Sequence, residues 1–256
     1  MFLDLGDVAG ALVGASAVGW GCLARRRRAE VADGPDWSDV EDRSDHTGNA
    51  PTGRTIAGSA LTWVYEVDPA KMPPGDLNYP ASFFFPGDFS PTRPPVSLVD
   101  WWAWAHGVGG SDVRTTKVVI TLQALEEVSI TVGSPILDHA VREAPHGVLC
   151  CPEGVGGGGV PPRTYEVNLS APGGPTARYA DRKRRPPEFV LAAGRTEQIE
   201  VIAYADSGWH EWTMRLPVTV DGQLRELDLS LYGDPFVTVG GSVGCHQLMW
   251  SGGRWS

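Results

Sequence analysis

The stretch EWTMRLPVTVDGQLRELDLSLYG, residues 211–233, decides the fold class because two independent patterns in it agree. Apolar and polar residues alternate on both sides of Asp221-Gly222, a pair typical of the two-residue turn of a β-hairpin. A turn there fixes the register, and a shift of one residue would bring every leucine to water. The predicted cross-strand partners are Trp212 with Leu231, Thr213 with Ser230, Met214 with Leu229, Arg215 with Asp228 and Leu216 with Leu227.

One residue in the hairpin limits where its strand can lie. Pro217 has no backbone N–H to donate to a neighbouring strand. We therefore expect the first strand of the hairpin to lie at a sheet edge, or to be bulged at this position.

Segments with the same period of two precede and follow the hairpin. Each is short and bounded by turn residues, as expected for half-buried strands. They are ALTWVYEV (60–67), KVVITLQA (117–124), VSITV (128–132), HGVLCC (146–151), TYEVNLSA (164–171), QIEVIAYA (198–205) and DPFVTVG (234–240). These segments predict eight or nine strands between Leu61 and Val239.

Two other segments of the same region break this pattern. SLVDWWAWAHG, residues 97–107, predicts a short helix that begins after Ser97 and ends at Gly107. The proline-rich run that contains SFFFPGDFSP, residues 82–91, predicts a loop whose phenylalanines close one end of the β-sandwich inferred below.

The predicted strands do not alternate with helices. This indicates a mainly β fold in residues 58–256, an antiparallel immunoglobulin-like β-sandwich. A closed barrel is the alternative.

Composition narrows the class of function. The chain has 256 residues, 32 Gly and 21 Pro, which favour a fold rich in turns. A formal net charge of −10 repels nucleic acid, so we expect no nucleic-acid partner. The motifs also indicate no cofactor. The run GVGGGGVPPR, residues 154–163, lacks the lysine and hydroxyl pair of a phosphate-binding loop.

The N-terminal residues predict a membrane anchor. Residues 8–24 are uncharged and mainly small or apolar, and as a helix they would span about 25 Å, close to the thickness of a bilayer core. Asp4 and Asp7 precede the run, which does not suit a cleaved export signal. A soluble helix at the start of the chain is a further alternative.

Arginines after this span and glycines along it predict its orientation and its association. The four arginines at 25–28 belong on the cytoplasmic side under the positive-inside rule. The glycines at 6, 10 and 14 recur at every fourth residue, a pattern that lets two membrane helices approach closely. We therefore predict a single-pass protein of the cell membrane, anchored by residues 1–28, with most of the chain in the cytoplasm and with homo-oligomers through the anchor. The residues concerned are Gly6, Gly10, Gly14, Arg25, Arg26, Arg27 and Arg28.

Residues 29–57 are acidic and polar with almost no apolar periodicity. Such a segment cannot bury enough surface to offset the entropy lost on ordering. The sequence therefore predicts a flexible linker between the anchor and the β-sandwich domain.

The run LDHAVREAPHGVLCCPEG, residues 137–154, gathers several side chains that bind metals. Zinc accepts such ligands, and catalytic zinc sites use three protein ligands and a water molecule. The spacing H-x6-H-x3-CC matches none of the compact zinc signatures, so an exposed polar loop with buried thiols is our first interpretation and no metal is expected. The candidate ligands of the alternative, a metal-dependent hydrolase, are Asp138, His139, His146 and Cys150.

Two exposed features are candidates for a partner surface. DRKRRPPE, residues 181–188, places four basic side chains, Arg182, Lys183, Arg184 and Arg185, in a loop bounded by proline. Such a loop can rest on anionic lipid, although a solvated loop is the simpler interpretation. Trp209 precedes the first strand of the hairpin and is the second candidate.

The order of a short span closed by arginines, a polar linker, LCCPEGVGGGGVPPRTYEVNL, FVLAAGRTEQIEVIAYA, HEWTMRLPVTVDGQLRELDL and DPFVTVGG resembles uncharacterised membrane-anchored β-sandwich proteins of actinobacteria. Some members of that group carry a paired-cysteine motif where this chain has DSGWHEW. The resemblance implies an architecture and no catalytic residue. We expect a non-enzymatic, membrane-tethered module that binds an unknown protein or another ligand. The alternatives are the metal-dependent hydrolase and a structural subunit of a membrane complex.

Overall fold

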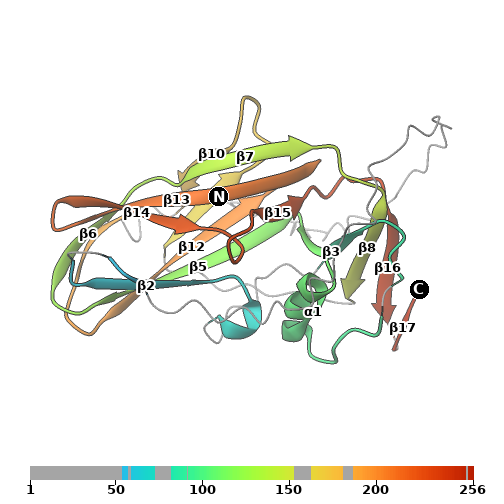
Figure 1. Ribbon diagram of the computed structural model, residues 1–256, viewed down its shortest axis with the longest axis horizontal. Helices are drawn as coiled ribbons and strands as arrows, with labels where there is room; N and C mark the ends of the chain where they lie inside the picture. Colours follow the sequence, from blue (N-terminus) through green and yellow to red (C-terminus); the bar gives the residue numbers. More distant parts are fainter. Residues whose placement is uncertain are drawn as a thin grey trace, which may run out of the picture. The chain divides into compact units, whose positions relative to one another are not determined.

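A computed structural model of the chain describes residues 54–56, 59–72, 82–90, 92–152, 163–180, 187–251 and 253–256. The predicted anchor, residues 1–28, and nearly all of the linker lie outside these ranges. No helix within them is long and apolar enough to cross a membrane. The fold is mainly β, with two sheets and one α-helix in the part of the chain that the structure describes (Figure 1).

The first sheet has six strands in the order β1-β2-β5-β12-β9-β10. All neighbours in it are antiparallel except β12 and β9, which run parallel. β1 belongs to the stretch that the sequence assigned to the linker. The strands are β1 (Arg54–Thr55), β2 (Leu61–Glu66), β5 (Thr115–Ala124), β9 (Thr164–Asn168), β10 (Thr176–Tyr179) and β12 (Thr196–Tyr204).

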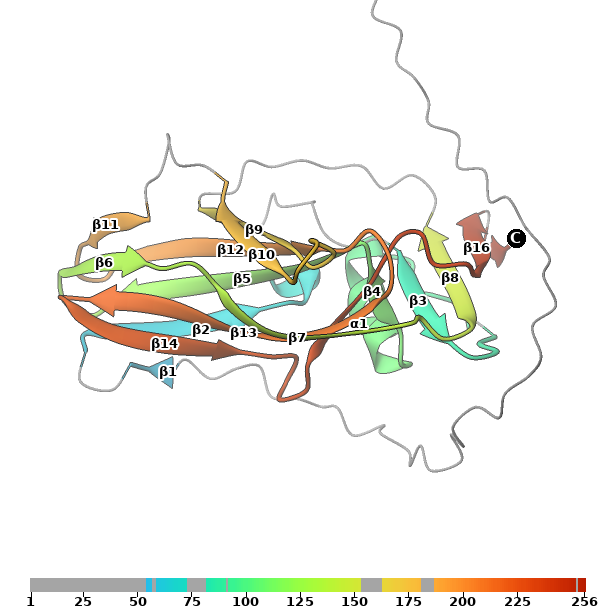
Figure 2. The ribbon, with the colours of Figure 1, turned by 90° about the horizontal axis from the view of Figure 1, so that it is seen from above.

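The second sheet has eleven strands around the long strand β13. One side of β13 pairs with β14 and β15, and the other side pairs with β6 and β7. Strands β3, β8 and β16 extend this sheet beyond the end of the first sheet (Figure 2). The strands are β3 (Phe83–Pro86), β4 (Ser111–Val113), β6 (Val128–Val132), β7 (Ile136–Arg142), β8 (Gly147–Pro152), β11 (Glu188–Leu191), β13 (Trp209–Val220), β14 (Gln223–Leu229), β15 (Phe236–Val239), β16 (His246–Ser251) and β17 (Arg254–Trp255).

The two sheets share one hydrophobic core, as the predicted alternation requires. Val118, Ile120 and Leu122 of β5 point into it, and so do Met214 and Leu216 of β13. The alternate positions of β13 are more exposed. A sandwich-like arrangement of two sheets is therefore confirmed, and its core is assembled from residues with a period of two.

The hairpin at Asp221-Gly222 has the predicted turn. Both residues adopt positive φ, 47° and 79°, as a turn that matches the twist of a two-residue hairpin requires. The predicted partners Met214–Leu229, Arg215–Asp228 and Leu216–Leu227 are confirmed.

The predicted partners of Trp212 and Thr213 are wrong. β14 ends at Leu229, because the chain turns at Leu231, whose N–H donates to the carbonyl oxygen of Asp234 at 2.7 Å. Beyond the end of β14, β15 is the neighbour of β13, and Trp212 pairs with Phe236 of β15 instead.

Pro217 lies in a central strand, so the first of the two predicted alternatives, a sheet edge, is wrong. Its strand has neighbours on both sides, but the two strands on one side, β6 and β7, leave a gap opposite Pro217. At this gap the N–H of Gly133 donates to the carbonyl oxygen of Pro217 at 2.8 Å. A proline is tolerated in the middle of the sheet because no strand there needs its missing N–H.

The predicted sandwich is antiparallel, but three strand pairs of the described residues are parallel: β12 with β9, β15 with β4 and β16 with β8. The three adjacent phenylalanines of SFFFPGDFSP, Phe83 to Phe85, are buried as predicted, but they belong to β3 and not to a loop. The predicted helix divides into η2 (Leu98–Asp100) and α1 (Trp101–Gly107), and Ser97 makes no side-chain cap. A further short helix, η1 (Pro69–Lys71), follows β2.

Candidate functional site

The four predicted metal ligands are not grouped in one site. Asp138 and His139 are neighbours on β7, so their side chains point to opposite faces of the sheet. His146 is exposed in the turn before β8, with its Nε2 3.5 Å from Oδ1 of Asp88. Cys150 lies on β8 with its side chain in the core.

Cys150 is poorly suited to bind a metal. Its thiol is fully buried, and burial, with smaller effects of Cys151 and Cys245, raises its pKa to about 12. A thiol binds metal as the thiolate, which is scarce near neutral pH at this pKa. Within the described ranges, no three or more His, Cys, Asp or Glu side chains are grouped so as to hold a metal ion.

His139 takes part in a different arrangement, which sequence reasoning missed. Its Nε2 lies 2.9 Å from Nδ1 of His210, and Nε2 of His210 lies 2.6 Å from the carbonyl oxygen of Ser207. A carbonyl oxygen only accepts, so Nε2 of His210 carries a proton and its Nδ1 accepts from His139. Both tautomers are thereby fixed. His210 is buried, whereas His139 is partly exposed at the open side of β7.

The hydroxyl of Ser170 completes this group, but it is not an activated nucleophile. Its Oγ lies 3.4 Å from Nε2 of His210 and accepts a hydrogen bond from the N–H of Asp206 at 3.0 Å. A serine nucleophile needs a neighbouring nitrogen that can accept its proton. Nε2 of His210 already carries a proton and donates it to Ser207, so the arrangement does not support acyl transfer.

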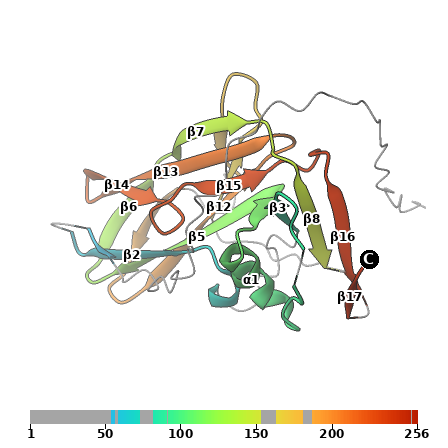
Figure 3. The same ribbon diagram turned by 45° about the vertical axis from the view of Figure 1, so that its right-hand side comes forward.

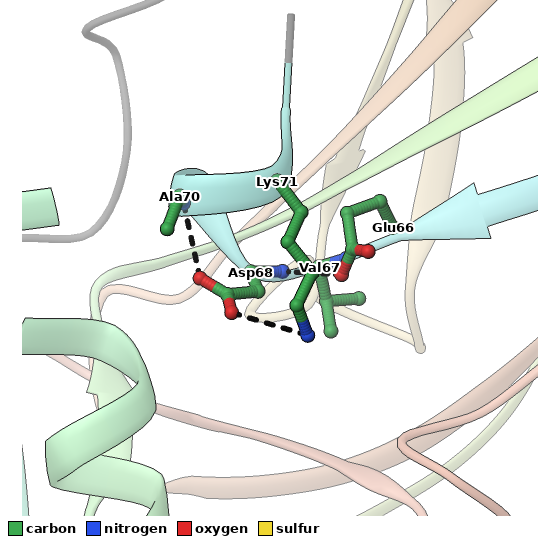
Figure 4. A network of polar contacts seen from close by, with 5 residues as sticks. All are labelled: Glu66, Val67, Asp68, Ala70 and Lys71. Atoms are coloured by element: carbon green, nitrogen blue, oxygen red, sulfur yellow. Dashed lines mark hydrogen bonds and ion pairs between the residues drawn. The ribbon is translucent and has the colours of Figure 1, made fainter. Parts of the chain in front are cut away.

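Two carboxylates at the end of β2 hold the backbone of η1 (Figure 4). Glu66 accepts hydrogen bonds from the N–H groups of Val67 and Asp68, each at 2.9 Å, and Asp68 accepts one from Ala70 at 3.0 Å. Nζ of Lys71 lies 3.4 Å from Asp68. The negative charges are thus bound to backbone donors and one ammonium group, which is the arrangement of a helix cap.

A buried histidine–aspartate contact and its aromatic neighbours join α1 to β4. Nε2 of His106 lies 2.9 Å from Oδ1 of Asp112, whose side chain is 2% exposed. The ring of His106 stacks on Trp102 with 4.1 Å between centroids and meets the edge of Phe83. This contact fixes the helix against the end of the second sheet.

Helix α1 and the β16–β17 hairpin lie near each other in Figure 3. Three tryptophans that these elements carry are in contact. We call Trp104 of α1, Trp250 of β16 and Trp255 of β17 the tryptophan surface. The ring centroids of Trp104 and Trp255 are 6.4 Å apart, and those of Trp250 and Trp255 are 5.1 Å apart. All three side chains are partly exposed and rest on the core.

Contacts with Trp101 and Thr92 fix the positions of Trp104 and Trp255 in the tryptophan surface. Trp101 is 2% exposed and contacts both Trp104 and Trp255 edge-on. Nε1 of Trp255 donates to the carbonyl oxygen of Thr92 at 3.1 Å, and Nε1 of Trp104 donates to its hydroxyl at 3.4 Å. The indole N–H groups of Trp104 and Trp255 therefore already have partners in Thr92.

The predicted partner residues have different positions. Trp209 is half-buried, because its ring packs edge-on against Phe84 at 6.0 Å and its Nε1 donates to Glu211 at 3.2 Å. The basic residues Arg182, Lys183, Arg184 and Arg185 lie outside the described residues, and so do Gly6, Gly10, Gly14 and Arg25 to Arg28 of the predicted anchor.

Sequence reasoning did not single out the tryptophan surface, although a signal for it exists. The segments WWAWAHG and WSGGRWS are both rich in tryptophan, but their meeting depends on the packing of α1 against the last two strands. No family model, no curated protein and no solved structure matches this chain. The resemblance to membrane-anchored proteins of actinobacteria therefore stays a prediction.

Proposed function

We propose that this chain is a non-enzymatic, membrane-tethered binding module whose partner is a protein that docks on the tryptophan surface. The observation that carries the proposal is the meeting of three partly exposed, mutually packed indole rings from three separate elements. Tryptophan is the residue most enriched at the energetic centres of protein interfaces. A cluster that is already fixed in place loses little side-chain entropy on binding.

One charge next in sequence to the tryptophan surface suggests the chemistry of the partner. Arg93 is exposed and follows Thr92, the residue that binds two of the indoles. Arginine, like tryptophan, is enriched in interfaces. In a chain with a formal net charge of −10, an arginine at this place favours a partner with a carboxylate beside the apolar side chain that contacts the tryptophans.

The finer features of the proposal rest on the sequence. The span of residues 8–24 and the arginines after it support a single-pass anchor with the module in the cytoplasm. Two facing sheets and the hairpin of β13 and β14 support the immunoglobulin-like classification. The anchor would hold the tryptophan surface close to the membrane, where its partner would then also lie.

The test is photocrosslinking of the full chain in membranes. A photoreactive amino acid replaces Ala103, an exposed residue of α1 next to Trp104, and in a matched control it replaces Val190, which is 65% exposed on β11. We expect one protein to be captured from position 103 and not from position 190. The captured protein is then purified, and its affinity for the chain is measured directly.

Two variants decide whether the tryptophans carry the binding. Trp104→Ala and Trp255→Ala should each weaken the measured affinity at least tenfold, because loss of a central aromatic side chain typically costs about 2 kcal/mol or more. Leu125→Ala, at an exposed site between β5 and β6, should leave the affinity unchanged. Equal capture from both crosslinking positions, or full affinity in both tryptophan variants, would contradict the proposal.

A further inference from the structure

Strand β7, Ile136–Arg142, is an unprotected sheet edge. It pairs one-to-one with β13 and with no other strand of the described residues, and it lies along the outer side of β13 in Figure 1. Every residue of β7 is exposed or partly exposed, and Val141 is 58% exposed. An edge of this kind offers a row of backbone N–H and C=O groups to another strand.

The other edges of the two sheets are mostly too short to serve in this way. β1 and β17 have two residues each, and β10 and β11 have four each. Proteins commonly protect their edges by shortening them or by adding charged side chains, proline or a bulge. β7 has seven residues, its sequence ILDHAVR contains no proline, and its register with β13 skips no residue. Its two charged residues, Asp138 and Arg142, have opposite signs.

The sequence of β7 is complementary to itself. Suppose that two copies form one continuous sheet, related by a two-fold axis perpendicular to it. Residues directly opposite each other then point to the same face of the sheet, and this is possible only when the residue on the axis pairs with its own copy. When that residue is Ala140, Asp138 of each copy lies opposite Arg142 of the other, twice per dimer. Opposite charges directly across a strand pair are favourable. The side chain of Arg142 is 66% exposed and already contacts Glu211, so it can bridge both carboxylates.

The other long edge strand shows that this complementarity is not general. β14, Gln223–Leu229, also has seven residues and pairs only with β13 among the residues described. If β14 paired with its own copy about Arg225, the two Arg225 side chains would lie opposite each other, and about Glu226 the two Glu226 side chains would do so. About Leu227, Glu226 would lie opposite Asp228. Each of these three registers places like charges opposite each other, which is unfavourable.

We propose that two copies of this chain form a symmetric dimer by antiparallel pairing of β7 with β7, centred on Ala140. The two second sheets then form one continuous sheet across the dimer. This surface is separate from the tryptophan surface, so each can exist without the other. It is also separate from the predicted association of the anchor helices.

Crosslinking at the two-fold position is the first test. Paired Cα atoms across an antiparallel ladder lie about 4.5–5.5 Å apart, within the range that a disulfide spans. Ala140→Cys in the full chain, purified in mild detergent and mildly oxidised, should give several times more disulfide-linked dimer than the wild type. Glu226→Cys, the matched position on β14, should stay at the wild-type level. A wild-type level of dimer for Ala140→Cys would overturn the proposal.

Charge reversal is the second test, with the dimer dissociation constant measured by analytical ultracentrifugation. Asp138→Arg places two arginines opposite each other at both ends of the strand pair, and the dimer should weaken about tenfold. The double variant Asp138→Arg with Arg142→Asp restores opposite signs and should recover most of the affinity. Both positions are exposed, so folding should be kept, which far-ultraviolet circular dichroism checks. An unchanged dissociation constant for Asp138→Arg would contradict the register.

Discussion

His139 donates from Nε2 to Nδ1 of His210, 2.9 Å away, and this single hydrogen bond makes the two imidazoles unequal. His210 is buried and donates from Nε2 to the carbonyl oxygen of Ser207, 2.6 Å away. His139 can be protonated on Nδ1 without losing its bond to His210.

This arrangement predicts that acid destabilises the protein. Burial, and then the charge of His210, lowers the pKa of His139 below its ordinary value of 6.5. The unfolded chain then binds more protons than the folded chain as the pH falls through 6.5, so the free energy of unfolding decreases. The stabilisation is fully present above that pH. Chemical denaturation at several values between pH 5 and 8 measures the slope.

His139→Gln is the variant that tests the origin of this slope. Its amide can still donate to His210, but it does not titrate, so the free energy of unfolding should vary less with pH than in the wild type. A slope that His139→Gln leaves unchanged would assign the effect to another group.

Lys117 and Glu200 form an ion pair whose side chains are only 2% and 4% exposed. Removing one partner of a buried pair takes away the attraction that offsets the desolvation of the other charge, so Lys117→Met or Glu200→Leu alone should lower the free energy of unfolding by about 3–5 kcal/mol. The double variant should lose much less than either single one. Guanidinium unfolding of the four proteins measures the coupling, and additive losses would contradict it.

Two glycines should respond in opposite directions to alanine. Gly222 adopts a φ of +79° in the β13–β14 turn, where Gly222→Ala is strained and should cost about 1 kcal/mol. Gly107 lies in α1 without a positive φ and without neighbours that an added Cβ would meet. Gly107→Ala should therefore stabilise the protein by about 0.5–1 kcal/mol. Thermal unfolding distinguishes the two, and a loss for both would show that α1 also needs its glycine.

Cys150 should resist alkylation as long as the protein is folded. Its thiol is buried and its pKa is raised to about 12, so thiolate is scarce at pH 8. Mass spectrometry after iodoacetamide treatment should find Cys150 unmodified in the folded chain and modified in denaturant. Rapid labelling of Cys150 without denaturant would show that β8 opens readily.

The parts of the fold that were predicted correctly depend on local physics. The alternation of β5 and β12, and the register Met214–Leu229 and Leu216–Leu227, follow from burial and from one turn. The wrong partners of Trp212 depend on where β14 ends, which a turn stabilised by Asp234 decides. Periodicity says which face of a strand is buried, but not which strand lies beside it.

The same limit applies to the sites. His139 was a candidate, but its partner His210 comes from another strand, 71 residues away, and no spacing along the chain links them. Trp104 and Trp255 are separated even further in the sequence, although their rings are neighbours. Sequence alone located residue types with useful chemistry, and strand order decided which of them meet.

The parallel pairing of β16 with β8 has a consequence for the order of folding. His246 is the partner of Val148, so this contact closes a segment of 98 residues, the difference between 246 and 148. Contacts between residues far apart in the sequence form slowly, because the chain loses much conformational entropy before any stabilising contact forms. During synthesis on a ribosome, the edge of β8 would stay unpaired until β16 had emerged. During this interval the nascent chain is most exposed to aggregation and to chaperones.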